Sequence, residues 1–274
     1  MIQFKDISTR LYTAIVFTAF VLAGLMISKW TYFALLFIIS VLCGYELTMI
    51  ISGLKRKLRF FISLTFSFVP VLMGMVIRED VLNVKDSLLL GIIACWLLFL
   101  LASELLSVQS NPVEKTARSM FSFIYVGIPS LLAYELAFKD GSFSYLPLLG
   151  VIVLIWINDT GAYLVGSAIG KKPLMPSVSP KKTVEGTLGG IIATIALAWP
   201  LSMINDAFTY PQWLIVATIT GVSGTIGDLV ESKLKRHYGI KDTGTYLPGH
   251  GGFLDRFDSF LFVVSFVYLY TQLI

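Results

Sequence analysis

The residues IIACWLLFLL, at positions 92–101, form an apolar run with no charged or strongly polar side chain. A transmembrane β-strand alternates apolar and polar residues over about ten positions, so an unbroken run of this kind favours a helix. A helix needs about 20 apolar residues to cross a hydrocarbon layer about 30 Å thick, and long runs recur along the chain between short polar breaks. The sequence therefore predicts an all-α, polytopic integral membrane protein.

Composition and the spacing of the apolar runs give the expected organisation. Hydrophobic residues make up 56% and charged residues 14% of the 274 positions, and the mean hydropathy is +0.80, which excludes an ordinary soluble domain. About nine spans are predicted, and they fall at 11–28, 31–51, 60–77, 87–106, 117–137, 145–167, 187–204, 211–229 and 257–273. Residues 1–140 would hold about five of them. Residues 141–274 would hold about four, with two long cytoplasmic polar loops at 168–186 and 230–256, and loops of that length usually carry function.

The basic residues indicate how the spans are oriented. If the N-terminus is cytoplasmic, 17 of the 21 Lys and Arg residues face the cytoplasm, and the C-terminus lies on the opposite side. The residues left on the opposite face are Lys29, Arg78, Lys85 and Lys139. Any correctly inserted membrane protein shows such a bias, and a basic face also attracts anionic lipid, so the bias by itself marks no active site.

The longest polar segment, SKLKRHYGIKDTGTYLPGHGGFLDRFD at 232–258, lies between the last two predicted spans. It combines basic side chains, a glycine-rich turn around His250 and two aspartates three residues apart. Its basic residues and turn glycines include Lys233, Lys235, Arg236, Lys241, Gly249, Gly251 and Gly252. Phosphate groups and a divalent cation would need such a set, because cations and backbone N–H groups bind phosphate and carboxylates bind the metal.

Three aspartates are candidate metal ligands. Asp255 and Asp258 are three residues apart at the start of the last predicted helix, so both carboxylates are expected on one face, and Asp228 near the end of the preceding span adds a third acid. Oxygen ligands without a His or Cys cluster favour Mg²⁺ over zinc. The alternative for Asp255 and Asp258 is helix capping, in which aspartates bind free N–H groups, and the spacing leaves both open.

The stretch SPKKTVEG, at 179–186, is a candidate anion site just before a predicted span. Lys181 and Lys182 supply positive charge, Thr183 a hydroxyl and helix cap, and Gly186 allows close approach. A basic pair beside a membrane is otherwise a topology anchor.

Acids inside apolar sequence form a third group. Asp159 should face other protein, either as a hydrogen-bonded structural acid or as the lining of a polar cavity. Glu46 and Glu104, near the cytoplasmic ends of two predicted spans, are similar but less specific.

The 232–258 segment resembles the signature of the phosphatidate cytidylyltransferases, also called CDP-diacylglycerol synthases. The residues that match this pattern are Ser232, Leu234, Lys235, Arg236, Lys241, Asp242, Gly244, Leu247, Pro248, His250, Gly251, Gly252, Phe253, Asp255, Arg256, Phe257 and Asp258. The run from Asp159 to Gly166, the SPKKTVEG stretch and the approach from Gly224 to Asp228 also look like this family. The resemblance covers residues from about 150 onward.

The resemblance implies Mg²⁺-dependent transfer of CMP from CTP to phosphatidic acid in phospholipid biosynthesis, giving CDP-diacylglycerol and pyrophosphate. It implies a polar cavity open to the cytoplasm and laterally to membrane lipid, in the inner membrane if the source is bacterial. The implied catalytic residues are Asp228, Asp255, Asp258, Lys235, Arg236 and Lys241, with the three aspartates holding Mg²⁺ and a second cation, divalent or monovalent, left open. The implied substrate contacts are Lys181, Lys182, Thr183, Glu185, Gly186, Ser232, His250, Gly251, Gly252, Arg256 and Asp159.

Two alternatives compete with this interpretation, one within the enzyme class and one outside it. A CTP-using enzyme acting on another membrane acceptor, such as a polyprenol kinase or an ether-lipid cytidylyltransferase, would share the basic and acidic residues. A secondary transporter would show similar spans, but transporters usually place their sites at the bilayer midplane, whereas the acids here group at one face. No nucleic-acid partner is expected. A homodimer is left open, since the glycines at 186, 189 and 190 permit close helix approach.

Overall fold

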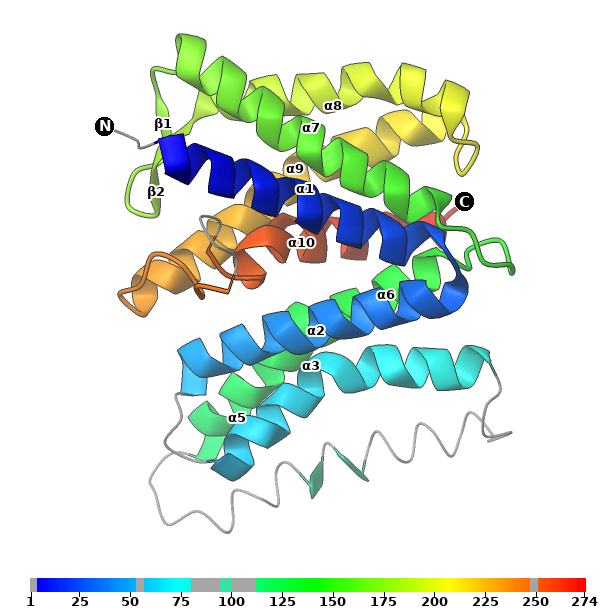
Figure 1. Ribbon diagram of the computed structural model, residues 1–274, viewed down its shortest axis with the longest axis vertical. Helices are drawn as coiled ribbons and strands as arrows, with labels where there is room; N and C mark the ends of the chain where they lie inside the picture. Colours follow the sequence, from blue (N-terminus) through cyan, green and yellow to red (C-terminus); the bar gives the residue numbers. More distant parts are fainter. Residues whose placement is uncertain (1–3, 53–56, 80–94, 97, 100–111, 247–250) are drawn as a thin grey trace.

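The computed structural model describes residues 4–52, 57–79, 95–96, 98–99, 112–246 and 251–274, and these form helices and one small sheet (Figure 1). The first helices are α1 (Phe4–Met26), α2 (Lys29–Ser52), α3 (Lys57–Arg78), α5 (Pro112–Ser122) and α6 (Ile128–Leu136), with a π-helical turn, η1 (Phe123–Gly127), joining the last two. The others are α7 (Leu146–Ile169), α8 (Val184–Ile204), α9 (Tyr210–His237) and α10 (Leu254–Thr271), with strands β1 (Pro173–Met175) and β2 (Ser179–Thr183) between α7 and α8.

Within the part of the chain that the structure describes, six helical segments are long and apolar enough to cross a membrane: Lys29–Ile51, Phe60–Arg78, Thr116–Leu136, Leu146–Ile169, Val184–Ile204 and Tyr210–His237. Helices α1 and α10 coincide with two more predicted spans. The span predicted at 87–106 lies outside the described residues, apart from 95–96 and 98–99. The prediction of a mostly helical membrane protein is confirmed, while the count of nine spans and the orientation stay predictions.

The polar segment before α8 contains a β-hairpin that the sequence did not indicate. Strands β1 and β2 pair antiparallel, with Pro173 opposite Thr183 and Met175 opposite Ser179. The prolines at 173, 176 and 180 exclude a continuous helix here, because proline lacks the N–H that a helix interior needs. The expectation of helices and loops alone is therefore wrong for residues 173–183.

Helix α9 is longer than the span predicted within it. It continues to His237 instead of ending near 229, so Ser232, Lys235 and Arg236 lie on a helix and not in a loop. Residues 230–238 contain no glycine or proline that would end the helix. Gly239, which follows the helix, has a positive φ of 69°. Basic residues in the last turn also favour this extension, because they complement the negative end of the helix dipole.

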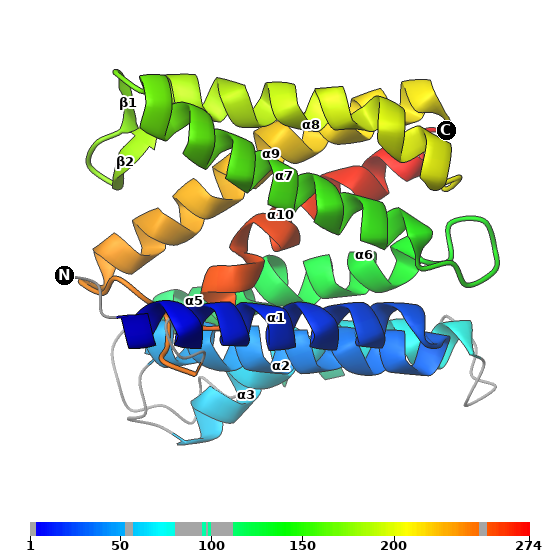
Figure 2. The same ribbon diagram turned by 45° about the horizontal axis from the view of Figure 1, so that its top comes forward.

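Helix α10 lies at the centre of the molecule, packed against α9 on one side and α6 on the other (Figures 1 and 2). Helix α1 packs on α2 and faces α7 and α10, so an element from the first part of the chain covers the second (Figures 1 and 2). The ring of Phe17 on α1 lies 5.7 Å from that of Phe257 and 6.3 Å from that of Phe253. These aromatic contacts hold α1 against the start of α10.

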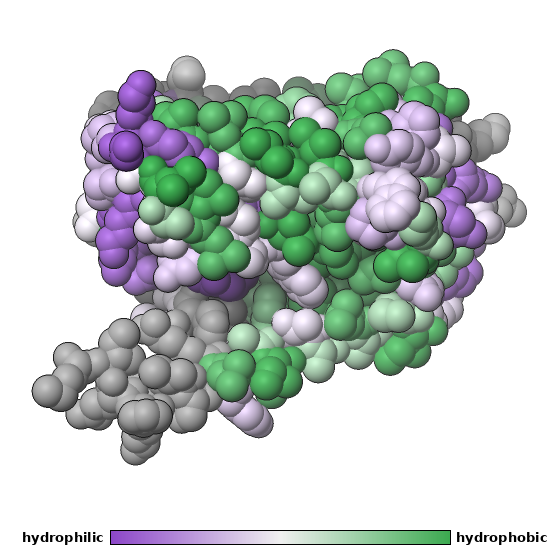
Figure 3. Space-filling view, turned by 90° about the horizontal axis from the view of Figure 1, so that it is seen from above, coloured by the Kyte–Doolittle hydropathy of each residue, from purple (hydrophilic) through white to green (hydrophobic). Residues whose placement is uncertain are grey.

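The two ends of the helix bundle differ in what they carry. The start of α1, the β-hairpin and the end of α9 gather at one end, and the C-terminus lies at the other (Figure 1). Ion pairs between Lys29 and Glu79 and between Arg78 and Glu135 link helix ends and loops away from the hairpin. Hydrophobic side chains cover most of the face between the hydrophilic edges (Figure 3), as expected for a protein surrounded by hydrocarbon.

Glycines bring α7 and α8 into backbone contact. A Cβ added to Gly186 would lie 2.7 Å from the carbonyl oxygen of Ala162, and one added to Gly190 would lie 2.6 Å from that of Asn158. A Cβ at Gly189 would likewise overlap Val165. The glycines considered for contact with a second copy therefore serve packing within the chain.

Candidate active site

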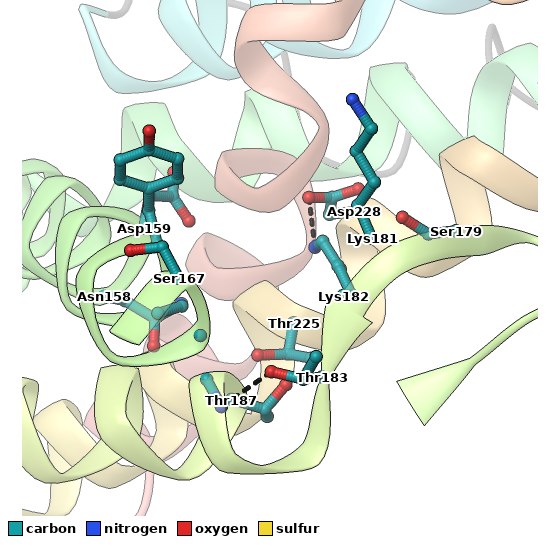
Figure 4. A pocket seen from close by; sticks show the side chains of 14 residues that line it. Asn158, Asp159, Ser167, Ser179, Lys181, Lys182, Thr183, Thr187, Thr225 and Asp228 are labelled. Atoms are coloured by element: carbon teal, nitrogen blue, oxygen red, sulfur yellow. Dashed lines mark hydrogen bonds and ion pairs between the residues drawn. The ribbon is translucent and has the colours of Figure 1, made fainter. Parts of the chain in front are cut away.

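A cavity of about 430 Å³ lies between α7, β2, α8 and α9 (Figure 4). Its polar lining comes from Asn158, Asp159, Ser167, Ser179, Lys181, Lys182, Thr183, Thr187, Thr225 and Asp228, and Gly186 borders it. Six of the predicted site residues, Asp159, Lys181, Lys182, Thr183, Gly186 and Asp228, thus meet in one place. Ser167 and Thr187 were not predicted, because isolated hydroxyls in apolar sequence carry no recognisable pattern. Ser179 and Thr225 lie in stretches that the sequence indicated, but neither was singled out.

Lys182 and Asp228 form the charged centre of this first cavity. The Lys182 ammonium donates a hydrogen bond to Asp228 Oδ2, joining β2 to α9 (Figure 4). The other oxygen of Asp228 accepts a hydrogen bond of 3.2 Å from the Ser232 hydroxyl, one turn later on α9. Both charged side chains remain about 30% accessible, so a ligand in the cavity can reach them.

The local sequence explains how Lys182 is placed. Thr183 caps α8, its hydroxyl accepting a hydrogen bond of 3.1 Å from the N–H of Gly186, and this fixes the helix start directly after Lys182. Glu185 accepts hydrogen bonds from the N–H groups of Lys171 and Lys172 at 3.0 and 3.1 Å. Glu185 thus closes the turn between α7 and β1 and does not line this cavity, and its predicted substrate contact stays a prediction.

Asp159 connects the first cavity to a second one of about 230 Å³. The second cavity lies between α1, α7 and α10, and Asp255, Arg256 and Asp258 line it from α10. From α1 come Thr13, Ala14, Phe17 and Thr18. Nothing in the sequence of α1 indicated a part in the site, because two threonines among apolar residues form no recognisable motif. In Figure 4, Asn158 and Asp159 on α7 face Lys182 and Asp228 across the first cavity.

Asn158 adds an unused acceptor to this arrangement. Its side chain is buried, at 4% exposure, and within the described part of the chain Oδ1 has no hydrogen-bond partner. A buried polar atom without a partner costs free energy, so its retention beside a cavity favours a role in binding a ligand.

Asp255 lines the second cavity together with Asp258, but both of its oxygens make structural contacts. Its Oδ2 accepts hydrogen bonds from the N–H groups of Thr243 and Gly252 at 2.9 and 2.8 Å. Its Oδ1 accepts one of 2.7 Å from the Lys235 ammonium, which also pairs with buried Glu231 at 2.5 Å. Asp255 therefore fixes the segment before α10, and Lys235 neutralises the buried acids Glu231 and Asp255. The metal-binding role of Asp255 and the catalytic role of Lys235 stay predictions.

We expect Asp255→Asn to lower the free energy of unfolding by about 1–3 kcal/mol, because donors at Thr243, Gly252 or Lys235 would lose a charged acceptor. The midpoint of thermal unfolding in detergent measures this. Asp242→Asn, at an exposed position in the same segment, serves as the control and should leave the midpoint unchanged. An unchanged midpoint in Asp255→Asn would contradict this structural role, and metal binding would again be the better explanation for Asp255.

The remaining predicted residues are distributed around the two cavities. Arg236 donates to the carbonyl oxygens of Val178 and Ile240 at 3.4 and 3.2 Å, and so ties the hairpin to the end of α9. Lys241 is exposed and lines neither cavity. Gly251 has a positive φ of 83°, which favours glycine at this turn. His250 lies outside the described residues.

The predicted metal ligands do not converge as they stand. Asp228 lines the first cavity and Asp258 the second, and among the described residues no three His, Cys, Asp or Glu side chains are placed to hold an ion. Mg²⁺ usually takes only one or two carboxylates and fills its shell with water and substrate phosphates. Asp228 and Asp258 could supply such a pair, whereas both oxygens of Asp255 already accept hydrogen bonds.

Comparisons with known proteins agree with these features. A sequence model described as the cytidylyltransferase family matches residues 8–274. The phosphatidate cytidylyltransferase of Bacillus subtilis (strain 168) is 36% identical over 242 residues, which cover 77% of this chain and 90% of that protein. That of Staphylococcus saprophyticus is 42% identical over 167 residues, covering 60% of this chain and 62% of that protein. That of Staphylococcus aureus (strain COL) is 44% identical over 148 residues, covering 53% and 55%.

Proposed function

Because this chain belongs to the cytidylyltransferase family, we propose that it transfers CMP from CTP to phosphatidic acid, forming CDP-diacylglycerol and pyrophosphate. The observation that carries the proposal is the pair of cavities sharing Asp159, with the Lys182–Asp228 pair in one and Arg256 in the other. One water-soluble and one lipid phosphate could meet at that shared wall.

The first cavity suits the triphosphate of CTP. Lys181 and Lys182 supply two positive charges, and the first turn of α8 adds the positive end of its dipole. The lining hydroxyls can donate further hydrogen bonds to phosphate oxygens. The free Oδ1 of Asn158 only accepts, so it would suit a hydroxyl of the ribose or the amino group of cytosine.

The second cavity suits the phosphate of a lipid. Arg256 supplies a permanent positive charge, and a guanidinium can bind two phosphate oxygens at once. Phe17 and Ala14 of α1 give the same cavity an apolar side, which matches the start of an acyl chain. A water-soluble acceptor would have no use for that apolar side.

The reaction needs alignment and charge neutralisation more than acid–base chemistry. A phosphate oxygen of phosphatidic acid would attack the α-phosphorus of CTP, forming a new P–O bond while the α–β bridge breaks and pyrophosphate leaves. A phosphate monoester has a second pKa of about 6, so the nucleophile is already a dianion near neutral pH and no general base is assigned. Lys182, held by Asp228, would neutralise charge on the departing phosphates. Mg²⁺, held by Asp228 and Asp258, would supply Lewis-acid charge stabilisation.

We expect the purified protein in detergent to release pyrophosphate only when CTP, phosphatidic acid and Mg²⁺ are all present. Label from α-³²P-CTP should enter the lipid, whereas label from the γ-phosphate should not. Transfer of the γ-phosphate to lipid would instead identify a kinase. Absence of both products with demonstrably folded protein, across several lipids and cations, would refute the proposed reaction.

We further propose that the chain crosses the membrane about nine times, with its N-terminus and both cavities on the cytoplasmic side. The clustering of the hairpin, the end of α9 and the start of α1 at one end of the bundle supports this orientation (Figure 1). The second cation and the homodimer stay predictions.

A further inference from the structure

We infer that Glu46, on α2, is a positioning residue for the proposed transfer: it holds the start of α10 where Arg256 and Asp258 reach the second cavity. The kinetic part of this inference rests on the proposed function. No pattern around Glu46 in the sequence connects it to α10, because its partners lie 197 to 208 residues further along the chain.

The carboxylate of Glu46 is buried, with the residue 2% exposed, and accepts three hydrogen bonds. Oε1 accepts from the backbone N–H of Phe253 at 2.9 Å, and Oε2 accepts from that of Leu254 at 2.8 Å. Oε2 also accepts from the Thr243 hydroxyl at 2.7 Å. One side chain of α2 therefore joins the start of α10 to Thr243, ten residues before Phe253 in the sequence.

The start of α10 needs this partner from elsewhere in the chain. The first N–H groups of any helix lack acceptors within the helix, and the N-cap residue of α10 is Phe253, whose side chain cannot accept a hydrogen bond. A carboxylate at this position also complements the positive end of the helix dipole. Glu46 meets both needs and forms charge-assisted hydrogen bonds, which are stronger than neutral ones.

Neighbouring contacts show that the fit is close. A Cβ added to Gly252 would lie 2.7 Å from Glu46 Oε1, so the backbone at 252 packs directly on the carboxylate. Thr243 is held from two sides, its hydroxyl by Glu46 and its N–H by Asp255. A shift of Glu46 would therefore move the start of α10, where Arg256 lies in the first turn and Asp258 directly after it.

The two substrates should respond differently to the loss of Glu46. The first cavity is built from α7, β2, α8 and α9, and none of its lining residues is a hydrogen-bond partner of Glu46. The second cavity depends on the start of α10. Weakening the hold on α10 should therefore raise the KM for phosphatidic acid and lower kcat, with little effect on the KM for CTP.

The test uses Glu46→Gln, in which an amide NH₂ group replaces one of the two acceptor oxygens. Because all three partners of Glu46 are donors, that NH₂ group would face a donor and lose at least one hydrogen bond. We expect kcat to fall about tenfold to a hundredfold, as for other small displacements of reacting groups, and the KM for phosphatidic acid to rise with that for CTP within about twofold. Thr243→Val, which removes only the hydroxyl donor, should shift the same two parameters less. The double variant should be no worse than Glu46→Gln, because both changes remove the same contact.

Glu135→Gln is the matched control, because Glu135 is also a helix-borne acid but pairs with Arg78, away from both cavities. Hydrogen exchange supplies a readout that does not need activity: the amides of Phe253 and Leu254 should exchange faster in Glu46→Gln and not in Glu135→Gln. Unchanged exchange, or a loss of kcat with both KM values unchanged, would overturn the inference. If Glu46→Gln does not fold, the test passes to Thr243→Val, and unchanged kcat and KM values in that variant would overturn the inference. A wild-type protein that makes no CDP-diacylglycerol refutes the proposed function, and the exchange result then decides the role of Glu46 alone.

Discussion

Asp228→Asn is expected to lower kcat for CDP-diacylglycerol formation about a thousandfold, a loss typical of removing a central charged group from a preorganised site. Asp228 accepts hydrogen bonds from the Lys182 ammonium and the Ser232 hydroxyl. Its negative charge also acts on the carboxyl groups of Asp159 and Asp258. The neutral amide would orient Lys182 less well and offer Mg²⁺ a single weak ligand. Steady-state formation of labelled lipid at saturating CTP and phosphatidic acid measures the effect.

The control for this variant is Asp140→Asn, which makes the same chemical change at an exposed aspartate paired with Lys139 in the turn after α6. It should leave kcat unchanged. A titration with Mg²⁺ separates the two roles given to Asp228: if it binds the metal, the Mg²⁺ concentration at half-maximal rate should rise in the variant. Full activity in folded Asp228→Asn would remove Asp228 from the site altogether.

Lys182→Met should lower kcat about a hundredfold to a thousandfold, because the variant keeps the length of the side chain but loses the charge that meets the departing phosphates. It also leaves Asp228 without its cation beside Asp159, so that two carboxylates would repel the incoming triphosphate. The KM for CTP should therefore rise together with the fall in kcat. Initial rates over a matrix of both substrate concentrations distinguish these effects.

Lys171→Met is the matched control, since Lys171 is exposed on the same side of the protein, lines neither cavity and contacts Glu185 through its backbone N–H. A general effect of surface charge on CTP or anionic lipid would reduce activity in both variants. Equal losses in Lys171→Met and Lys182→Met would contradict a specific role for Lys182.

The membrane class was predictable because hydropathy reports directly on the solvent around a helix. Helices α2, α3, α7 and α8 begin and end within a few residues of the predicted spans. The extension of α9 to His237 was missed for the same reason, since a helix that leaves the bilayer keeps its structure while its hydropathy falls. The β-hairpin was also beyond reach, because its strands are short and proline-containing and have no alternating pattern.

Local sequence predicted which residues gather at the site better than it predicted what each one does. Lys182, Asp228 and Asp159 do meet, and their residue types suggested phosphate chemistry. Spacing placed Asp255 and Asp258 on one helix face, but in the first turn a carboxylate can fold back onto free N–H groups, and Asp255 does so. The part played by Glu46 depends on how α2 packs against α10, which no short stretch of sequence records.

The backbone contact between α7 and α8 has a mechanical consequence. The same two helices that touch through Gly161, Gly186 and Gly190 also form the wall of the first cavity that carries Asp159 and Thr187. They cannot separate without opening a void between close-packed backbones, which a protein interior resists. That wall should be rigid. We therefore expect the β1–β2 hairpin and α1, on the other sides of the cavities, to move when substrates enter and CDP-diacylglycerol leaves.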